Sequence, residues 1–213
     1  MSEIIDDRIT HYLNSLRGEV DPLMAEMESF AKERKIPILE WQTADFIEQL
    51  ILINKPKKVL EVGTAIGYTT IRIAKMLQPG ASIETIELSK DNIPLARENF
   101  IKAGLEEKIA LHEGNALSII PDLSKDYDII FLDADKEDYM EYYNQLADKL
   151  RVGGILLIDN LLWHGYVVEQ EVKENYKAST RVVMELNKII LRDERFKSTI
   201  LTIGDGLGMC IKL

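Results

Sequence analysis

Residues 59–67 read Val-Leu-Glu-Val-Gly-Thr-Ala-Ile-Gly, and they indicate the fold more directly than any other part of the chain. A short apolar segment runs into a turn of small residues, and an amphipathic segment follows from Tyr68. This order predicts a strand, a loop and the first turn of a helix, as in nucleotide-binding units. Glycine suits such a loop because the backbone passes close to a ligand or takes a positive φ angle. A plain strand–turn–helix of another α/β protein stays open at this point.

An acidic residue at the end of the first strand distinguishes this loop from a pyrophosphate-binding loop, whose Gly-x-Gly-x-x-Gly fingerprint is absent. The spacing instead fits the acidic-x-Gly-x-Gly-x-Gly pattern of S-adenosylmethionine-dependent methyltransferases, with alanine in place of the middle glycine. The residues of this pattern are Glu61, Gly63, Ala65 and Gly67. We therefore expect the Glu61 carboxylate to lie beside a cationic group.

Length and composition predict one α/β domain that spans residues 1–213. The formal charge of −10 argues against broad, non-specific binding of nucleic acid, although it permits a local basic patch. Cys210 is the single cysteine, and no signal peptide or membrane-spanning apolar run is present in the sequence. These features favour a cytoplasmic protein without a membrane partner.

Strand and helix patterns alternate along the chain, which predicts a doubly wound, mostly parallel seven-stranded sheet with helices on both faces. Expected strands are 58–62, 83–87, 109–112, 127–132, 155–158, 199–203 and 207–212. Expected helices are 3–16, 22–34, 40–54, 68–78, 90–103, 136–150 and 173–192, with a short helix at 115–122. Gly204-Asp205-Gly206 suits a hairpin turn, so the sheet should end in an antiparallel C-terminal pair.

The first three helices form an N-terminal helical extension over residues 1–55 rather than a second domain. Apolar residues recur along the first helix at helical spacing, at Ile5, Ile9, Tyr12 and Leu16. This stripe favours packing on another surface, and we expect a homodimer.

The carboxyl ends of strands two and three supply candidate cofactor contacts, because ligands of open α/β sheets bind at that edge. Glu87 ends the second strand about 20 residues after the glycine loop, where a carboxylate suits the two hydroxyls of a ribose. Asn115 follows the third strand, where its carbonyl oxygen can accept a hydrogen bond from an adenine amine. A helix cap is an equally good interpretation of Asn115.

The fourth and fifth strands stop abruptly in polar residues. Asp133 follows the fourth strand, and Asp159 and Asn160 follow the fifth. Three oxygen ligands at neighbouring strand ends suit Mg²⁺, with positions left for water and substrate. Lys136 lies one helical turn beyond Asp133 and is close enough to face the same cleft. Turns and caps are the alternative role of such residues.

At this point the sequence resembles the cation-dependent O-methyltransferases related to the catechol and caffeoyl-CoA enzymes. The resemblance covers nearly the whole chain. Its carriers are residues 59–64, 67–69, Glu87, 131–136, Gly153-Gly154, Asp159-Asn160, Trp163, Gly165 and 204–207. Within the family, residues 56–58 and 64–68 are most similar to the bacterial enzymes that methylate 5-hydroxyuridine at the tRNA wobble position.

The resemblance implies a role for each matching position. S-adenosylmethionine would contact Leu39, Glu61, Gly63, Thr69, Glu87, Asn115, Ala116 and Asp133. Mg²⁺ would be held by Asp133, Asp159 and Asn160, and Lys136 would be the general base. Two positions depart from the family pattern: Asn115 stands where aspartate is usual, and Ala65 replaces a glycine.

Three functions remain open from the sequence. The first is Mg²⁺-dependent methylation of 5-hydroxyuridine in the tRNA anticodon loop, the second is methylation of small catechols or phenols, and the third is a non-catalytic binding domain. The complete set of lysine and metal ligands argues against the third. A basic patch for RNA would draw on Lys57, Lys58, Arg151, Lys173, Lys177, Arg181 and Arg192. Trp163 and His164 are candidates for the wall of the acceptor pocket, with a core position as the alternative for Trp163.

Overall fold

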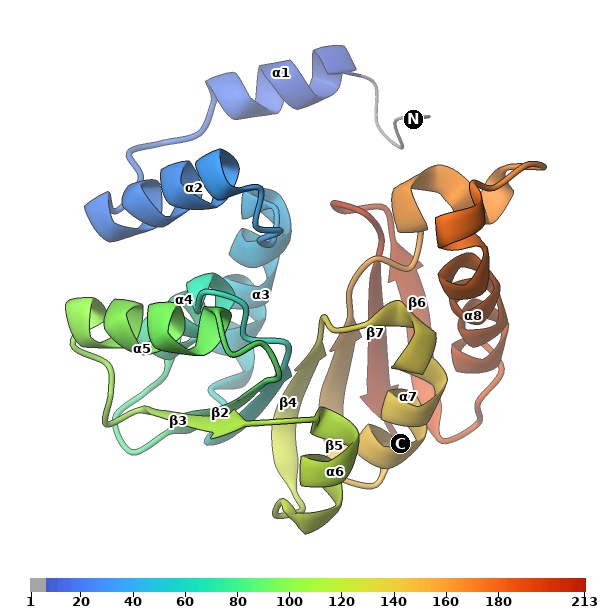
Figure 1. Ribbon diagram of the computed structural model, residues 1–213. Coiled ribbons are helices and arrows are strands. Elements are labelled where there is room, and N and C mark those ends of the chain that lie inside the picture. The colour runs from blue at the N-terminus through green and yellow to red at the C-terminus, as the bar shows by residue number, and fades with distance from the viewer. Residues whose placement is uncertain (1–6) are drawn as a thin grey trace.

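The computed structural model describes residues 7–213 and shows a central sheet between two layers of helices (Figure 1). The strands are β1 (Lys58–Val62), β2 (Ser82–Glu87), β3 (Ile109–Glu113), β4 (Tyr127–Leu132), β5 (Leu150–Ile158), β6 (Phe196–Leu201) and β7 (Leu207–Lys212). The α-helices are α1 (Asp7–Ser15), α2 (Pro22–Arg34), α3 (Trp41–Asn54), α4 (Tyr68–Met76), α5 (Asn92–Ala103), α6 (Ala116–Ile119), α7 (Tyr139–Ala147) and α8 (Lys177–Ile190). Short 3₁₀ turns are η1 (Ile120–Asp122), η2 (Lys136–Asp138), η3 (Trp163–Val168) and η4 (Glu174–Tyr176).

The strand order is β3-β2-β1-β4-β5-β7-β6, which confirms the predicted seven-stranded, mostly parallel sheet. The strands β1 to β5 pair in parallel, whereas β7 pairs antiparallel with both β5 and β6. The strand order changes direction at β1: β2 and β3 follow on one side of it, and β4 and the later strands lie on the other side. In open α/β sheets this switch point opens a crevice at the carboxyl ends of the strands, which is where ligands bind.

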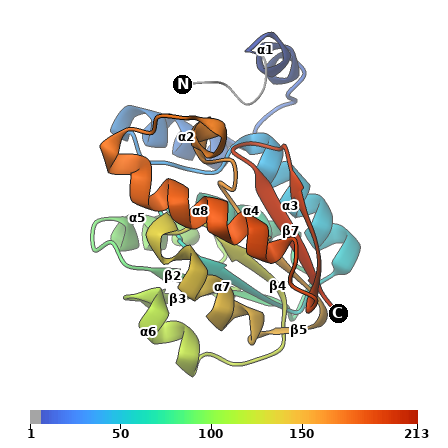
Figure 2. The ribbon, with the colours of Figure 1, turned by 90° about the vertical axis from the view of Figure 1, so that its right-hand side faces the viewer.

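Alternate residues of the strands point to opposite faces and form two cores. Val59, Ile83 and Ile129 pack under α2–α5, whereas Leu60, Ile130 and Leu156 pack under α6–α8. Figure 2 shows α7 and α8 in front of the sheet, and Figure 1 shows α3, α4 and α5 on the side away from them. Successive side chains of a strand point to opposite faces, so a strand that is buried on both faces contributes to both cores.

The element bounds differ from the sequence-based ones mainly near the C-terminal half. The strand expected at 199–203 is Phe196–Leu201, because residues from 202 onward already form the turn into β7. The helices expected at 136–150 and 173–192 each begin with a 3₁₀ turn, and β5 starts at Leu150 rather than at residue 155. Such errors at element ends arise because termini are less regular than interiors.

The N-terminal helical extension packs α2 and α3 on the sheet layer, while α1 stands beyond them (Figure 1). Ile9, Tyr12 and Leu16 are all more than half exposed, whereas Ile5 lies outside the described residues. The predicted homodimer stays a prediction. None of the helices within residues 7–213 combines the length and the apolar character needed to cross a membrane.

Candidate active site

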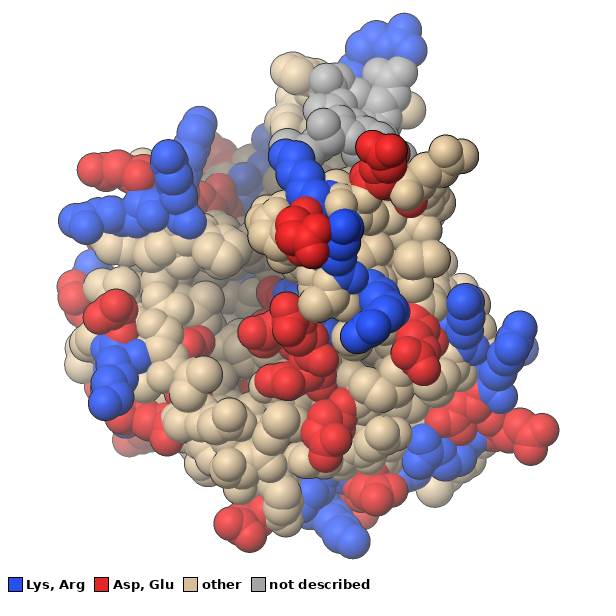
Figure 3. All heavy atoms as spheres, turned by 45° about the vertical axis from the view of Figure 1, so that its right-hand side comes forward, with Lys and Arg blue, Asp and Glu red and all other residues tan. Residues whose placement is uncertain are grey.

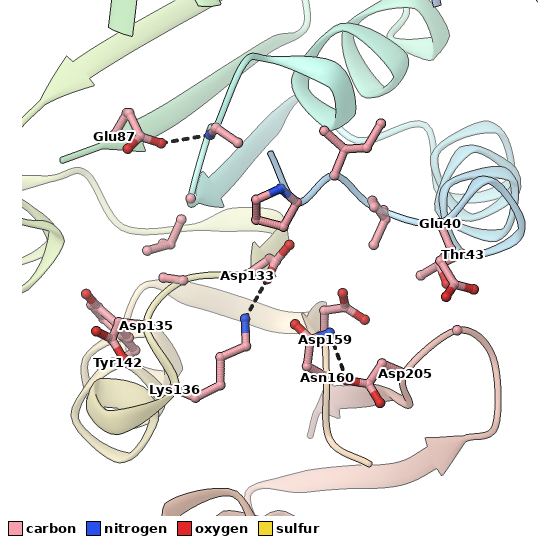
Figure 4. Close-up of a pocket in the computed structure, with 18 of the residues that line it drawn as sticks. Glu40, Thr43, Glu87, Asp133, Asp135, Lys136, Tyr142, Asp159, Asn160 and Asp205 are labelled. Carbon is pink, nitrogen blue, oxygen red and sulfur yellow. Dashed lines mark hydrogen bonds and ion pairs between the residues drawn. The ribbon is translucent and has the colours of Figure 1, made fainter. Parts of the chain in front are cut away.

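A cavity of about 880 Å³ opens at the carboxyl ends of β1 to β5 (Figure 4). This volume lies within the usual range for ligand pockets. Its walls come from the loops after these strands, the start of α3, the β6–β7 turn and two residues of α1, Thr10 and Leu13. The cavity therefore lies at the switch point that the strand order creates.

The glycine loop forms one wall of this cavity, and its glycines are required by geometry. Gly63 has a φ angle of 103°, and a Cβ atom there would lie 1.8 Å from the carbonyl oxygen of Asp133. Gly67 also has a positive φ angle, and a Cβ atom there would meet the ring of Phe100. Ala65 takes a left-handed conformation with φ of 47°, which disfavours alanine relative to the glycine it replaces.

Glu87 joins the glycine loop to the second strand. One of its carboxylate oxygens accepts a hydrogen bond from the backbone N–H of Ala65 at 2.7 Å, and the other accepts from Ser89 N–H at the same distance (Figure 4). The side chain therefore stabilises the strained loop, and it also lines the cavity.

Six of the eight predicted cofactor residues line the cavity. They are Leu39, Gly63, Glu87, Asn115, Ala116 and Asp133. The Asn115 side chain also accepts a hydrogen bond from Leu117 N–H at 2.8 Å, so it caps α6. The cap interpretation of Asn115 is thus confirmed, whereas its contact with an adenine amine stays a prediction.

The other two predicted cofactor residues, Glu61 and Thr69, do not line the cavity. Glu61 is fully buried within β1, and one carboxylate oxygen accepts hydrogen bonds from the hydroxyls of Thr70 and Thr85. Its other oxygen has no hydrogen-bond partner. The hydrogen-bond partners of Glu61 within residues 7–213 are therefore two hydroxyls, and its expected cationic neighbour stays a prediction. Burial raises the pKa of Glu61 to about 8.

Replacing Glu61 with glutamine should remove a pH-dependent loss of stability. In the folded protein Glu61 keeps its proton up to about pH 8, whereas in the unfolded chain it loses the proton near the ordinary value of 4.5. The wild-type free energy of unfolding should therefore fall between these two pH values relative to the Glu61→Gln variant, by on the order of a few kcal/mol. Denaturant titrations at pH 5 and pH 8 check this, and an equal difference at both values would contradict it.

Lys136 and Asp133 form the centre of the cavity. The Lys136 Nζ lies 2.8 Å from Asp133 Oδ1 (Figure 4). The ammonium also lies over the rings of Tyr139 and Trp163. Its side chain is only 12% exposed. Lys136 is thus held in place by charge and by aromatic faces, as the sequence predicted for a residue facing the same cleft.

Asp159 carries a carboxylate that the rest of the protein does not satisfy. The side chain is buried in the cavity wall, and its Oδ1 has no hydrogen-bond partner. Burial, together with the nearby carboxylate of Asp133, raises the pKa of Asp159 well above its usual range. A buried anionic oxygen beside a second carboxylate is stabilised by a bound cation.

Asn160 adds a neutral oxygen donor beside these two carboxylates, and its Nδ2 donates to Asp205. Within residues 7–213, no three His, Cys, Asp or Glu side chains form a metal-binding group. The predicted set differs from such a group because it contains two carboxylates and one amide. Oxygen donors of this kind, with an unpartnered buried oxygen among them, fit a hard cation such as Mg²⁺.

Aromatic side chains form the wall of the cavity beyond Lys136. Trp163 and His164 line it, and their ring centroids are 5.0 Å apart. Tyr166 and Tyr176 stack next to them at 5.1 Å. The Trp163 indole N–H donates to the hydroxyl of Ser179 on α8, which fixes the ring half-exposed rather than in the core. Trp163 thus lines the cavity and also packs against the core under α6–α8, and its contact with an acceptor stays a prediction.

The sequence profile of the family described as O-methyltransferase matches residues 15–213. The chain belongs to this O-methyltransferase family. It is 32% identical over 177 residues to caffeoyl-CoA O-methyltransferase of Medicago sativa, which covers 79% of this chain and 72% of the relative. A caffeoyl-CoA O-methyltransferase of Nicotiana tabacum is similar to the same extent, with 73% of its length covered.

Solved structures agree with this assignment. A methyltransferase from Geobacter sulfurreducens is 28% identical, with a TM-score of 0.83 and coverage of 99% of this chain and 98% of that one. An O-methyltransferase from Bacillus cereus in complex with SAH has a TM-score of 0.86, with 24% identity and 97% coverage of both chains. The fold of this O-methyltransferase is therefore that of the class I S-adenosylmethionine-dependent enzymes.

The cavity of the methyltransferase contains polar residues that sequence reasoning did not assign to the site. Glu40 and Thr43 come from the start of α3, and Asp205 comes from the β6–β7 turn (Figure 4). Thr43 is fully buried with an unpartnered hydroxyl, and burial raises the pKa of Glu40 above its ordinary value. The Gly-Asp-Gly turn is the sequence signal at Asp205, but by itself it predicts only a hairpin, and by resemblance a family motif.

The basic residues proposed for an RNA-binding patch do not form one surface of the enzyme. Lys57 precedes β1 and Lys58 begins it, whereas the site lies at the other end of that strand. Each strand residue adds about 3.3 Å to this separation. Arg151 pairs with Asp128 at this same far edge, and Arg192 lies beyond the C-terminal end of α8. These four are therefore removed from the cavity mouth, which corrects the expected patch.

The remaining three basic residues lie near the aromatic wall. They are Lys173, which precedes η4, and Lys177 and Arg181 on the first turns of α8, and all three are exposed. In Figure 3 a hollow opens in the forward face, acidic side chains gather beside it, and basic side chains stand above them. Acidic and basic side chains thus both lie next to the hollow on this face.

Proposed function

We propose that this O-methyltransferase transfers a methyl group from S-adenosylmethionine to the 5-hydroxyl of 5-hydroxyuridine at the tRNA wobble position, giving 5-methoxyuridine. The observation that carries the chemistry is the grouping of Lys136, Asp133 and Asp159 next to the glycine loop in one cavity. The related Bacillus cereus enzyme holds SAH, the product that S-adenosylmethionine leaves after methyl transfer. Both observations support an S-adenosylmethionine site in this cavity.

The donor assignment can be tested at Glu87. We expect Glu87→Ala to weaken S-adenosylmethionine binding by about 1–3 kcal/mol, because hydrogen bonds to the ribose and to the Ala65 N–H are lost together. Calorimetry on the purified protein measures the change, with exposed Glu106→Ala as the matched control. Unchanged affinity in Glu87→Ala would remove Glu87 from the site.

The residues around Asp159 fit a divalent cation, and Asp133, Asp159 and Asn160 would hold it. Bound there, Mg²⁺ would lower the pKa of an acceptor hydroxyl and orient it. To act as base, Lys136 would first release the proton of its ammonium to solvent, and the neutral amine would then accept the hydroxyl proton at Nζ. The rings of Trp163 and Tyr139 would exclude water around it. Methyl transfer then requires the acceptor oxygen in line with the sulfonium methyl.

A flat acceptor ring suits the aromatic wall. Proteins bind unstacked bases by stacking them on aromatic side chains, and Trp163 and His164 offer such faces beside Lys136. Lys173, Lys177 and Arg181 supply positive charge near the same wall, where phosphates of an anticodon loop would lie. The similarity of residues 56–58 and 64–68 to the tRNA-modifying enzymes favours this acceptor over others.

Charge-reversal variants test whether tRNA binds at the basic residues near the aromatic wall or at those on the far edge of the sheet. We expect Lys177→Glu combined with Arg181→Glu to raise KM for tRNA carrying 5-hydroxyuridine by roughly 10-fold or more, because phosphate contacts are lost. Lys57→Glu is the matched control at the opposite end of β1 and should leave KM unchanged. KM for tRNA should also rise with salt in the wild type. Equal effects of the double variant and the control variant would contradict tRNA binding near the aromatic wall.

Methylation of small catechols is the second candidate, and specific observations favour it. Asp135 and Asp138 line the cavity mouth, the formal charge is −10, and the curated relatives are caffeoyl-CoA enzymes. Incubation of the enzyme with labelled S-adenosylmethionine and either tRNA or a catechol panel decides between the two. Catechol turnover that exceeds tRNA turnover, without salt dependence, would replace the tRNA proposal.

A further inference from the structure

The loop after β5 is held in an unfavourable backbone conformation. Asn160, Trp163 and His164 have φ angles of 60°, 46° and 54°, and none of them is glycine. Each residue in this left-handed region costs free energy, and such conformations persist only where surrounding contacts enforce them. This loop carries both the predicted metal ligand Asn160 and the aromatic wall, so the contacts that enforce it bear on the reaction.

Those contacts come from the β6–β7 turn. The backbone N–H groups of Leu161 and Leu162 donate to the carbonyl oxygens of Gly206 and Asp205, at 2.9 and 2.8 Å. The Asp205 carboxylate accepts from His164 N–H at 2.6 Å through Oδ1. Its Oδ2 accepts from Asn160 Nδ2 at 3.3 Å (Figure 4). One side chain therefore bonds to both ends of the strained segment.

The Asp205 carboxylate also fixes which end of the Asn160 amide is free. An ionised carboxylate only accepts hydrogen bonds, so the amide must turn its Nδ2 toward Asp205. Its Oδ1 is then the atom left for a cation. Without Asp205 the amide can rotate and offer a nitrogen, which does not ligate Mg²⁺ well.

We propose that Asp205 is a positioning residue of this methyltransferase, which holds Asn160 and the Trp163–His164 wall in their working orientation through the loop after β5. The proposal rests on the metal-dependent mechanism of the proposed function. Asp205 acts through Asn160 and His164 and takes no proton from the acceptor. The side chain is only 13% exposed, so water replaces these hydrogen bonds poorly once it is removed.

The test compares Asp205→Ala, Asp205→Asn and the exposed control Asp122→Ala. Mn²⁺ binding is followed by electron paramagnetic resonance, and S-adenosylmethionine binding by calorimetry. We expect Asp205→Ala to lower Mn²⁺ affinity by about 10–100-fold, as substitutions behind metal ligands do, while the cofactor affinity changes less than about twofold. Asp205→Asn keeps one accepting oxygen and should show an intermediate loss.

A second measurement reports on the loop without any metal. Trp41→Phe leaves Trp163 as the only tryptophan, so acrylamide quenching then reads the exposure of the aromatic wall. We expect quenching to increase in Asp205→Ala and to stay unchanged in Asp122→Ala. If the wild type binds no Mn²⁺, the metal-dependent function fails, and the quenching comparison still decides whether Asp205 holds the loop.

Two results would overturn the proposal. One is wild-type Mn²⁺ affinity and wild-type Trp163 quenching in Asp205→Ala. The other is a parallel loss of Mn²⁺ and S-adenosylmethionine affinity together with a lowered Tm, which would mark Asp205 as a general stabiliser of the fold.

Discussion

Lys136→Ala is expected to lower kcat by about 10²–10⁴-fold while S-adenosylmethionine still binds with wild-type affinity. The Lys136 side chain lies 2.8 Å from Asp133, and its removal takes away the proposed acceptor for the hydroxyl proton. The predicted cofactor residues Leu39, Gly63 and Ala116, which line the cavity, are untouched by this change. Single-turnover assays with labelled S-adenosylmethionine separate the chemical step from binding.

The matched control for this variant is Lys125→Ala, an exposed lysine outside the cavity, which should retain full activity. A pH profile adds a second criterion, because activity of Lys136→Ala should recover in part at high pH, where the acceptor hydroxyl ionises unaided. Wild-type turnover in Lys136→Ala at neutral pH would contradict the role of Lys136 as base.

Asp159→Asn should abolish most activity and at the same time make the protein more stable. The variant lacks the proposed anionic ligand of Mg²⁺, so we expect methyl transfer at a given Mg²⁺ concentration to fall by about 10²-fold or more. The apo protein should gain stability, because the buried carboxylate next to Asp133 is replaced by a neutral group of the same shape. Tm of the apo protein and activity as a function of Mg²⁺ measure the two effects.

Asp148→Asn, at an exposed site at the end of α7, is the control and should change neither quantity. In the wild type, chelation with EDTA should remove activity and Mg²⁺ should restore it. Full turnover in EDTA, or a less stable Asp159→Asn protein with normal activity, would exclude the role assigned to Asp159.

Much of the site follows from local patterns in the sequence. The apolar run of β1, the small residues after it and the carboxylates after β4 and β5 are each contained in fewer than ten residues. Because parallel strands bring their carboxyl ends to one edge, residues at those ends meet in the folded protein. Asp133, Asp159 and Lys136 could therefore be predicted to share a cavity, and the structure places them there.

The environment of Glu61 could not be predicted in this way. Its partners Thr70 and Thr85 come from α4 and β2, and the residue at the end of β1 faces them rather than the cavity. The same limit applies to the basic residues, whose separation follows from the end of the strand or helix at which each lies. Burial and charge grouping depend on contacts between distant segments, which a local pattern does not contain.

The hairpin turn shows most clearly what the local sequence determines and what only the tertiary structure decides. The glycines around Asp205 indicate that two antiparallel strands are joined there, and the sequence alone establishes that much. Whether β6 or β7 pairs with β5 is set by long-range packing, and β7 is the neighbour of β5. This insertion brings the turn beside a residue 45 positions earlier, so that Asp205 bonds to Asn160. Local propensity specifies each element, but only the packing of all seven strands brings these two side chains within hydrogen-bonding distance.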